Sequence, residues 1–237
     1  MYATSAIDGE VPVLAWLRTF YVGRLIRDNG FNMKIIGKFS AILSLPVGYR
    51  LFGWMVGGGS AWRTYLAKYV KPAPGDKILD IGCGPADVLN YLPAVNYTGL
   101  DISREYICSA KKRFGSRGRF CCSDVGLATI EGEQGTFDLV LAIGVIHHLD
   151  DAQAARLFDL ARLALRPTGR LVTYDGCYVS QQSQIARWLL AKDRGKFVRT
   201  REDYLRLALA RFSKVEPHLR HDLLRIPYTH LIMRCFD

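Results

Sequence analysis

The stretch Ile78–Leu89, which reads ILDIGCGPADVL, decides the fold of this chain of 237 residues. Its apolar, partly β-branched start predicts a strand over 77–81, and the glycines Gly82 and Gly84 predict a turn directly after it. A helix is expected to begin at Pro85, because proline suits the first helical position, where an N–H would be unpaired anyway. Glycines let the backbone approach a ligand closely, and a helix N-terminus offers free N–H donors. The stretch therefore predicts a ligand-binding turn at the carboxyl end of a strand.

The same turn excludes two common nucleotide motifs. A dinucleotide fingerprint needs a third glycine at position 87, but Asp87 stands there, and its carboxylate would lie near the pyrophosphate. No GxxxxGK[ST] motif is present, so a P-loop is excluded. Asp80, Asp101 and Asp124 instead end three successive predicted strands, at the sheet edge where open α/β folds bind ligands. Three carboxylates without a phosphate cradle suit a cationic adenosyl ligand, whose ribose hydroxyls Asp101 can accept.

Short apolar runs alternate with helical patterns through the middle of the chain. A helix is expected after the N-cap candidate Ser103, and helices are expected near 180–191 and at 201–211 in the tail. The expected strands cover residues 77–81, 97–101, 119–124, 137–145 and 169–176, and a long amphipathic helix covers 150–165. Two strand-like runs, at 212–219 and 229–236, have no helix between them and should pair antiparallel. This alternation predicts an α/β fold with a mostly parallel sheet covered by helices on both faces.

Composition bounds the class of protein. Hydrophobic residues make up 49% and charged residues 23% of the chain, which excludes a disordered protein. The six cysteines form no CxxC pair, so we expect reduced thiols and no structural zinc. The first residues show no charged start followed by an apolar run, so no signal peptide is expected and the protein is predicted to be cytoplasmic.

The net charge of +10 lies in the flanks of the chain. Residues 1–71 carry +6, residues 72–176 carry −2 and residues 177–237 carry +6. The asymmetry favours an anionic partner. Three kinds fit, namely a phosphate or carboxylate substrate, a membrane surface, and nucleic acid. The alternative is that the surface is basic without binding an anionic partner. The apolar stretch Phe39–Gly59 is too interrupted to span a bilayer, but peripheral contact with a membrane, or a role as the cap of a pocket, stays open.

Four motifs together carry a resemblance to a known family. The segments ILDIGCGPAD, GLDIS, CSDVG and FDLVLAIGVIHHLDD resemble, in order and spacing, the motifs of class I S-adenosylmethionine-dependent methyltransferases, over about residues 76–176. The resemblance implies a Rossmann-like, seven-stranded, mostly parallel sheet with an antiparallel last strand, here with an extra N-terminal helical segment. It also implies S-adenosyl-L-methionine as the cofactor and S-adenosyl-L-homocysteine as the product.

The resemblance assigns cofactor contacts position by position. The methionine end would be held by Asp80, Gly82, Cys83 and Gly84, and the ribose by Asp101. Ile102 would pack on the adenine face, Asp124 and Val125 would meet the adenine edge, and Ile143 would line the floor. The family often has a third glycine where this chain has Ala86, and we expect this small residue to be tolerated.

The candidate catalytic residues are His147 and His148, which follow the fourth predicted strand. A neutral histidine there can act as a base near neutral pH. In the resembling phosphoethanolamine-type enzymes, a histidine at the position of His148 acts with an N-terminal tyrosine, for which Tyr21 and Tyr49 are the candidates. Asp175 and Tyr178 follow the fifth strand and would touch the acceptor, although capping of a loop explains them equally well.

The organisation and the function follow as hypotheses. Residues 1–70 are expected to form a helical lid or substrate segment, and residues 71–237 the methyltransferase domain, with a helical insertion at 177–211 near the acceptor. The first hypothesis is methylation of a small, anionic or amphiphilic molecule by in-line displacement. The alternatives are an RNA or protein methyltransferase, against which the chain shows no RNA-binding module, and a non-catalytic S-adenosylmethionine-binding protein. The sequence does not define the oligomeric state.

Overall fold

The computed structural model describes residues 58–124, 130–192 and 195–237. The contacts within the chain divide it into two compact units, Met1–Val56 and Gly57–Asp237, and the description below concerns the second unit. Tyr21, Tyr49 and Val125, together with nearly all of the apolar stretch before Gly58, lie outside the described residues. Within the described part of the chain, no helix is long and apolar enough to cross a membrane.

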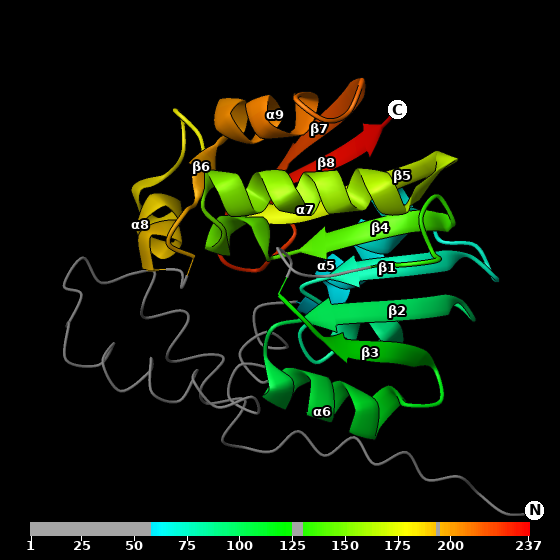
Figure 1. Ribbon diagram of the computed structural model, residues 1–237. Helices are drawn as coiled ribbons and strands as arrows, with labels where there is room; N and C mark the ends of the chain where they lie inside the picture. Colours follow the sequence, from blue (N-terminus) through cyan, green and yellow to red (C-terminus); the bar gives the residue numbers. More distant parts are fainter. Residues whose placement is uncertain (1–57, 125–129, 193–194) are drawn as a thin grey trace, which may run out of the picture. The chain divides into compact units, whose positions relative to one another are not determined.

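A mostly parallel sheet with the strand order β3-β2-β1-β4-β5-β8-β7 forms the centre of the unit (Figure 1). The first five strands in this order pair in parallel, and β8 runs antiparallel to both of its neighbours. This confirms the predicted fold class, including the antiparallel pairing of the two C-terminal strands. The strands are β1 (Lys77–Ile81), β2 (Asn96–Asp101), β3 (Gly118–Cys122), β4 (Phe137–Ile143), β5 (Leu165–Tyr178), β7 (Lys214–Arg220) and β8 (His230–Phe236).

Two details of the sheet differ from the prediction. The two-residue strand β6 (Arg199–Thr200) pairs in parallel with the end of β5 and adds an eighth strand to the seven expected. β5 begins at Leu165 and not at Gly169, so that Pro167 lies inside a strand. The β4–β5 register shifts between Phe137 and Leu139, opposite this first part of β5. Proline has no N–H to donate to a neighbouring strand, and sheets tolerate it at irregularities of this kind.

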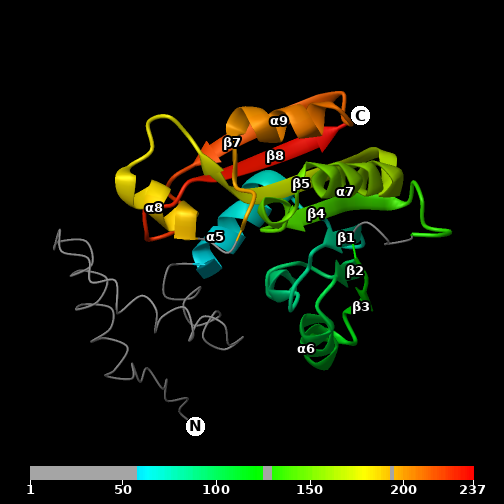
Figure 2. The ribbon, with the colours of Figure 1, turned by 60° about the vertical axis from the view of Figure 1, so that its left-hand side comes forward.

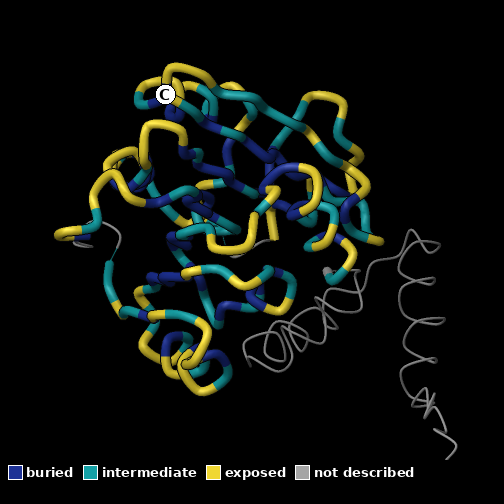
Figure 3. The backbone as a smooth tube through the Cα atoms, turned by 90° about the vertical axis from the view of Figure 1, so that its right-hand side faces the viewer, coloured by how far each residue is buried: buried dark blue, intermediate teal, exposed yellow. Residues whose placement is uncertain are grey.

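Helices cover both faces of the sheet, as predicted (Figure 2). Leu79 and Ile81 of β1 belong to a core cluster with α7 and α9, whereas Ile78 belongs to a second cluster with the helices of the opposite face. Alternate residues of a strand point to opposite faces, so a strand buried on both sides reads as a continuous apolar run. Buried segments therefore run through the middle of the unit, with exposed residues around them (Figure 3). The helices are α5 (Gly58–Tyr65), the π-helix η2 (Leu66–Val70), α6 (Arg104–Phe114), α7 (Asp151–Ala164), α8 (Gln184–Lys192) and α9 (Arg201–Leu209).

Side-chain caps fix where three of these helices begin. Ser103 accepts the Tyr106 N–H at the start of α6, which confirms the predicted N-cap. Asp150 and Gln153 form a full capping box at the start of α7. Thr200 accepts the N–H of Asp203, the third residue of α9, and its hydroxyl also donates to the Asp203 carboxylate, so Thr200 caps the helix without a full capping box.

The residues just before the sheet pack onto it. Tyr65 of α5 is fully buried, its hydroxyl donates to the carbonyl oxygen of Val172 at 3.1 Å, and its ring meets the ring of Tyr174 edge-on at 5.2 Å. Val70 at the end of η2 is also fully buried. Residues 58–70 thus form part of the core on one face of the sheet, next to the central strands β1, β4 and β5.

Candidate functional site

The glycine turn after β1 is held against the end of β2. The N–H groups of Gly82 and Cys83 both donate to the carbonyl oxygen of Leu100, at 2.8 and 2.9 Å. Gly82 has a φ of +74°, and a Cβ atom there would lie 2.6 Å from a methyl group of Val145. Only glycine therefore fits at this position, where the turn meets the segment that follows β4.

The helix predicted to begin at Pro85 is wrong. The chain forms a short 3-10 helix, η3 (Asp87–Asn90), and Ala86 before it adopts the left-handed region with a φ of +57°. The Ala86 N–H donates to the carbonyl oxygen of Cys83 at 2.9 Å, which closes a tight turn instead of a helical one. A left-handed residue cannot continue a right-handed helix, so no α-helix N-terminus follows the turn. This position is the one at which the family often has glycine.

Asp101 holds the turn from the carboxyl end of β2. Its Oδ2 accepts the N–H of Gly84 at 2.8 Å, and its Oδ1 accepts the N–H of Ser103 at 2.8 Å. Each carboxylate oxygen has a second acceptor site, so the group can still take hydrogen bonds from a ligand. The next residue, Ile102, is an exposed apolar side chain, with 71% of its surface accessible, directly beside this carboxylate.

Asp80 is the buried acid of the site. Only 2% of its surface is exposed, and the hydroxyl of Tyr97 donates to its Oδ2 at 2.6 Å. Burial raises the pKa of Asp80 to about 7; the Tyr97 hydrogen bond opposes the rise, and the charge of Asp101 adds to it. Its Oδ1 is buried and has no hydrogen-bond partner among the described residues. A buried carboxylate oxygen in this state is suited to a cationic ligand group.

The described residues at this edge fit S-adenosylmethionine. The unpartnered Oδ1 of Asp80 matches an ammonium group, Asp101 has acceptor capacity for ribose hydroxyls, and Ile102 offers an apolar face. Asp124, after β3, and Ile143, at the end of β4, are half-buried at the same carboxyl edge. Cys83 is buried, and burial raises the pKa of its thiol, so that it is a small apolar wall and not a nucleophile.

The two candidate histidines take different positions in the turn η4 (Ile146–His148), directly after β4. His147 is buried, and its Nδ1 lies 2.8 Å from Oδ1 of Asp175, which also accepts the backbone N–H of His147 at 3.2 Å. His148 is exposed, and the centres of the two imidazole rings lie 4.3 Å apart. The structure thus brings Asp175 together with His147. Tyr178, at the end of β5, is half-buried, with the guanidinium of Arg187 5.6 Å from the centre of its ring.

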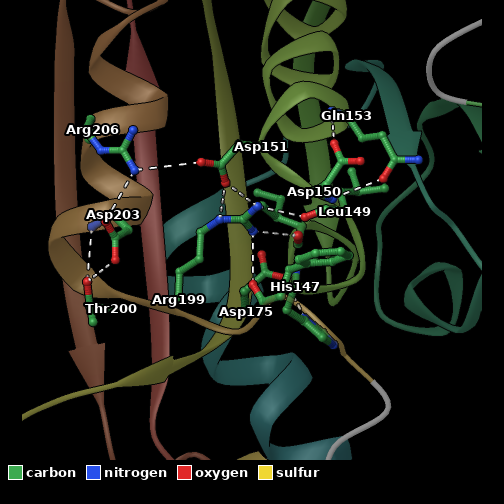
Figure 4. Close-up of polar contacts among 12 residues, drawn as sticks. His147, Leu149, Asp150, Asp151, Gln153, Asp175, Arg199, Thr200, Asp203 and Arg206 are labelled. Atoms are coloured by element: carbon green, nitrogen blue, oxygen red, sulfur yellow. Dashed lines mark hydrogen bonds and ion pairs between the residues drawn. The ribbon is translucent and has the colours of Figure 1, made fainter.

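Arg199 is a buried residue that the sequence analysis missed. Its guanidinium donates to the carbonyl oxygens of Ile146 and Leu149, on either side of the two histidines, at 3.2 and 2.7 Å (Figure 4). It also bonds the carboxylate of Asp151 at 2.8 Å and the carbonyl oxygen of Phe197 at 3.0 Å. Arg199 therefore ties η4 and the start of α7 to the segment that precedes β6.

Known proteins match the region of these motifs. A family model described as a methyltransferase domain matches residues 79–171. An O-methyltransferase of Pyrenophora dematioidea is 32% identical over 130 residues, which cover 50% of this chain and 47% of that protein. The N-terminal Xaa-Pro-Lys N-methyltransferase 1 of Mus musculus is 27% identical over 125 residues, which cover 48% of this chain and 55% of that protein. The chain spans about half the length of these curated relatives.

A solved structure supports the fold. The geranyl diphosphate C-methyltransferase from Streptomyces coelicolor A3(2) matches with a TM-score of 0.58 and 15% identity, over 75% of this chain and 80% of that one. The strand order, the glycine turn and the strand-end acids form an α/β domain whose sheet edge fits an adenosyl ligand. Residues 79–171 match a methyltransferase domain, and the fold around them is that of a methyltransferase whose solved structure contains S-adenosyl-L-homocysteine.

Proposed function

We propose that this chain transfers the methyl group of S-adenosylmethionine to a small-molecule acceptor. The observation that carries the proposal is the carboxylate of Asp101, which accepts the N–H groups of Gly84 and Ser103 and retains acceptor capacity at the sheet edge. Asp80 supports the proposal because its buried Oδ1 has no hydrogen-bond partner among the described residues. Gly82 supports it because the turn leaves no room for a side chain at this position.

In this proposal each residue has a defined task. Asp80 would pair with the ammonium group of the cofactor, and Asp101 would accept the ribose hydroxyls. Ile102 would cover the adenine, Asp124 and Val125 would meet its edge, and Ile143 would line the floor. The bound cofactor supplies an electrophilic methyl carbon. The protein then mainly aligns the acceptor with this carbon. Holding two reactants in the right geometry can lower the activation free energy by roughly 7–11 kcal/mol.

The acceptor end would lie at the carboxyl ends of β4 and β5. The turn η4 carries the two histidines there, Asp175 and Tyr178 come from β5, and residues 177–211 would form an insertion beside the acceptor. A basic group of the turn would take a proton from an acceptor that must lose one. Tyr21 or Tyr49 would assist from the residues before Gly58, which we propose as the acceptor lid, whereas residues 58–70 pack in the core and are not part of it.

The charge distribution favours an anionic or amphiphilic acceptor. Residues 1–71 and 177–237 each carry +6, whereas the segment between them carries −2. An excess of positive charge raises the local concentration of an anionic molecule and speeds its encounter with the site. The apolar stretch Phe39–Gly59 would cover a hydrophobic part of the acceptor or contact a membrane surface.

Methylation of a protein N-terminus is the second candidate, because one relative is an N-terminal Xaa-Pro-Lys N-methyltransferase. A substrate of that kind brings an amine and a lysine, both cationic at neutral pH. The net charge of +10 on this chain opposes its approach, which is why a small anionic acceptor is preferred.

A labelling experiment separates these acceptors. The full chain is incubated with tritium-methyl S-adenosylmethionine and with three extracts of one cell lysate, namely small aqueous metabolites, organic-soluble lipids and macromolecules. Label in either of the first two extracts supports the proposal. Label in protease- or nuclease-sensitive material would replace it with a macromolecular acceptor. Asp101→Ala should lose labelling in every extract, whereas the exposed Asp159→Asn on α7 serves as the matched control.

A further inference from the structure

A buried tyrosine on β2 holds the buried acid of β1. The hydroxyl of Tyr97 donates to Oδ2 of Asp80 at 2.6 Å, and the two residues are 3% and 2% exposed. Asp80 pairs with Gly99 across the parallel strands, so Tyr97 lies two residues earlier on the same face of the sheet. A short hydrogen bond from a hydroxyl to a carboxylate is among the stronger ones in proteins. The two side chains therefore form a fixed pair at the end of β1, directly before the glycine turn.

The packing around Tyr97 leaves its ring little freedom. A Cβ atom at Gly99 would lie 3.0 Å from Cε1 of Tyr97, and a Cβ atom at Gly118 on β3 would lie 2.9 Å from its Cδ1. The centre of the Phe120 ring, also on β3, lies 5.8 Å from the centre of the Tyr97 ring. The ring thus occupies space that side chains at two glycine positions would need, and its hydroxyl has a defined place beside the carboxylate.

Cys83 connects this pair with the glycine turn. A Cβ atom at Gly99 would also lie 2.8 Å from Sγ of Cys83, so the thiol and the Tyr97 ring border the same glycine. Burial raises the pKa of the Cys83 thiol, and the charges of Asp80 and Asp101 raise it further, so it stays uncharged at neutral pH. Buried surroundings screen a charge weakly. The charge of Asp80 therefore acts on the glycine turn even without direct contact between its carboxylate and a ligand.

The described groups around Asp80 are acids or apolar side chains. Burial raises the pKa of Asp80 to about 7; the hydrogen bond from Tyr97 lowers it, and the charge of Asp101 raises it. Burial, together with the charge of Asp80, raises the pKa values of Tyr65 on α5 and of Tyr97 well above their ordinary range. On β4, the residue opposite Asp80 is Leu141, which carries no charge. Among these described neighbours, Tyr97 is the one that favours the ionised carboxylate.

We propose that Tyr97 is a positioning residue of the cofactor site and that it acts through Asp80. Its hydroxyl fixes one oxygen of the carboxylate and favours the ionised form, which gives the glycine turn a negative charge for the ammonium end of the ligand. The other oxygen, Oδ1, has no hydrogen-bond partner among the described residues. The inference rests on the proposed function and deepens it, because it names the residue that keeps the buried acid charged near neutral pH.

The strength of the hydrogen bond sets the expected size of the effect. A hydrogen bond to a charged group is worth about 1–2 units of pKa, so Tyr97→Phe should raise the pKa of Asp80 by about this amount. At a pH below both pKa values, each unit lowers the ionised fraction about tenfold. The variant should therefore bind a ligand with an ammonium group about tenfold or more weakly at pH 6, and within about twofold of wild type at pH 9.

The first test needs no ligand. The full chain is labelled with ¹³C at its aspartate carboxyl groups, and the signal of Asp80 is assigned by its absence from the NMR spectrum of Asp80→Asn. The titration midpoint of this signal should lie about one pH unit or more higher in Tyr97→Phe than in wild type. Equal midpoints in the two proteins would overturn the proposal.

The second test measures binding of S-adenosylhomocysteine to the full chain by calorimetric titration between pH 6 and 9. The Kd of Tyr97→Phe is divided by the Kd of wild type at each pH, because the titration of the ligand's own amino group cancels in this ratio. We expect the ratio to fall from about ten or more at pH 6 to under about two at pH 9. A structural defect alone weakens binding alike at every pH, so a constant ratio would overturn the proposal.

Two further variants are matched controls for Tyr97→Phe. Tyr204→Phe removes another buried hydroxyl, which donates to the carbonyl oxygen of Gly176 at 3.1 Å, and it should leave the affinity unchanged at every pH. In an Asp80→Asn background, Tyr97→Phe should give a ratio that does not vary with pH, because position 80 then has no group to ionise. A ratio that still falls with pH in this background would show that Tyr97 acts through another group, which would overturn the proposal.

The outcomes separate this inference from the proposed function. If the wild-type chain does not bind S-adenosylhomocysteine at any pH, the proposed function fails and the inference falls with it. If wild type binds and the ratio is constant, the adenosyl site stands and only the role of Tyr97 is wrong.

A tyrosine analogue replaces Tyr97→Phe if that variant does not fold. A ring-fluorinated tyrosine at position 97 has a more acidic hydroxyl, which donates more strongly to the ionised carboxylate. It should bind S-adenosylhomocysteine more tightly than wild type at pH 6 and equally at pH 9. Equal affinities at pH 6 would overturn the proposal.

Discussion

Gly84 and Asp101 are joined by a hydrogen bond of 2.8 Å, from the glycine N–H to Oδ2 of the aspartate, across 17 positions of the sequence. The other oxygen of the same carboxylate accepts the N–H of Ser103 at the start of α6. One side chain therefore sets both the glycine turn and the loop after β2. In the proposed function the same group binds the ribose, so the cofactor would meet a carboxylate that is already oriented.

Gly82→Ala should destabilise the protein strongly. The new methyl group would lie 2.6 Å from Val145 and the residue would keep a φ of +74°. Strain in the left-handed region and overpacking together cost about 2–4 kcal/mol of the free energy of unfolding. Urea denaturation measures this loss. Adding Val145→Ala should restore the part due to overpacking. Gly84→Ala, with a φ of +54° and no atom within 4 Å of the new methyl group, should show the strain alone. Equal losses in the two single variants would contradict the steric account.

Ala86→Gly should stabilise the protein. Ala86 adopts a left-handed φ of +57°, which costs an L-residue about 1–2 kcal/mol, whereas glycine pays about 0.5–1 kcal/mol in conformational entropy. The expected gain in the free energy of unfolding is therefore about 0.5–1 kcal/mol. The comparison is Ala155→Gly in the middle of α7, which should lose about 1 kcal/mol. A loss of the same size at both positions would show that Ala86 is not strained.

Asp80 should make the stability of the cofactor-free protein depend on pH. Burial raises the pKa of Asp80 from 3.8 to about 7, so between these values the folded state keeps a proton that the unfolded state releases. The stabilisation is complete below about pH 4 and is lost as the pH rises through about 7, a difference of about 4 kcal/mol. Urea denaturation of wild type and Asp80→Asn across this range measures the difference. Parallel pH profiles of the two proteins would contradict it.

The same carboxyl should link pH to ligand binding. An ammonium group pairs with the ionised form of Asp80, so the affinity for S-adenosylhomocysteine should rise as the pH increases from about 6 to 8. Calorimetric titration of wild type and Asp80→Asn tests this, because the variant has no group to ionise. A rise of the same size in both proteins would place the titrating group elsewhere.

Arg199→Ala should lower the free energy of unfolding by about 3 kcal/mol. The side chain is 8% exposed and satisfies the carbonyl oxygens of Ile146, Leu149 and Phe197, which the variant would leave without these donors. Arg206 also lies within 4 Å of Asp151 but is exposed, so Arg206→Ala should cost under about 1 kcal/mol. Thermal unfolding compares the two. A similar small cost for both would mean that Arg199 does not hold η4.

The sequence predicts most of the sheet because its strands are buried on both faces. Apolar runs such as Phe137–Ile143 have no polar face, and a strand–turn–helix order leaves a parallel sheet as the main solution. The cap at Ser103 could be predicted because it depends only on hydrogen bonds between residues close in the sequence; the same holds for the cap at Asp150, which was not predicted. The helix at Pro85 was predicted wrongly, because the left-handed conformation of Ala86 leaves no trace in residue type.

The contacts that complete the site join distant segments and could not be read from spacing. Asp175 meets His147 across 28 positions, and Arg199 meets Ile146 across 53. The pairing of Asp80 with Tyr97 depends on register, since Asp80 lies opposite Gly99 and Tyr97 is two residues earlier on the same face. The strand-end acids could be predicted because parallel strands end at one edge. Their partners required the structure.

The central claim is that Asp101 organises the adenosyl site, and binding of S-adenosylhomocysteine to Asp101→Ala tests it most directly. Calorimetric titration at pH 8 should show a loss of about 1.5–3 kcal/mol, which is about 10- to 150-fold in Kd, as expected for charge-assisted hydrogen bonds. Asp159→Asn should bind as wild type does. An Asp101→Ala variant that folds and binds S-adenosylhomocysteine with unchanged affinity would contradict the account.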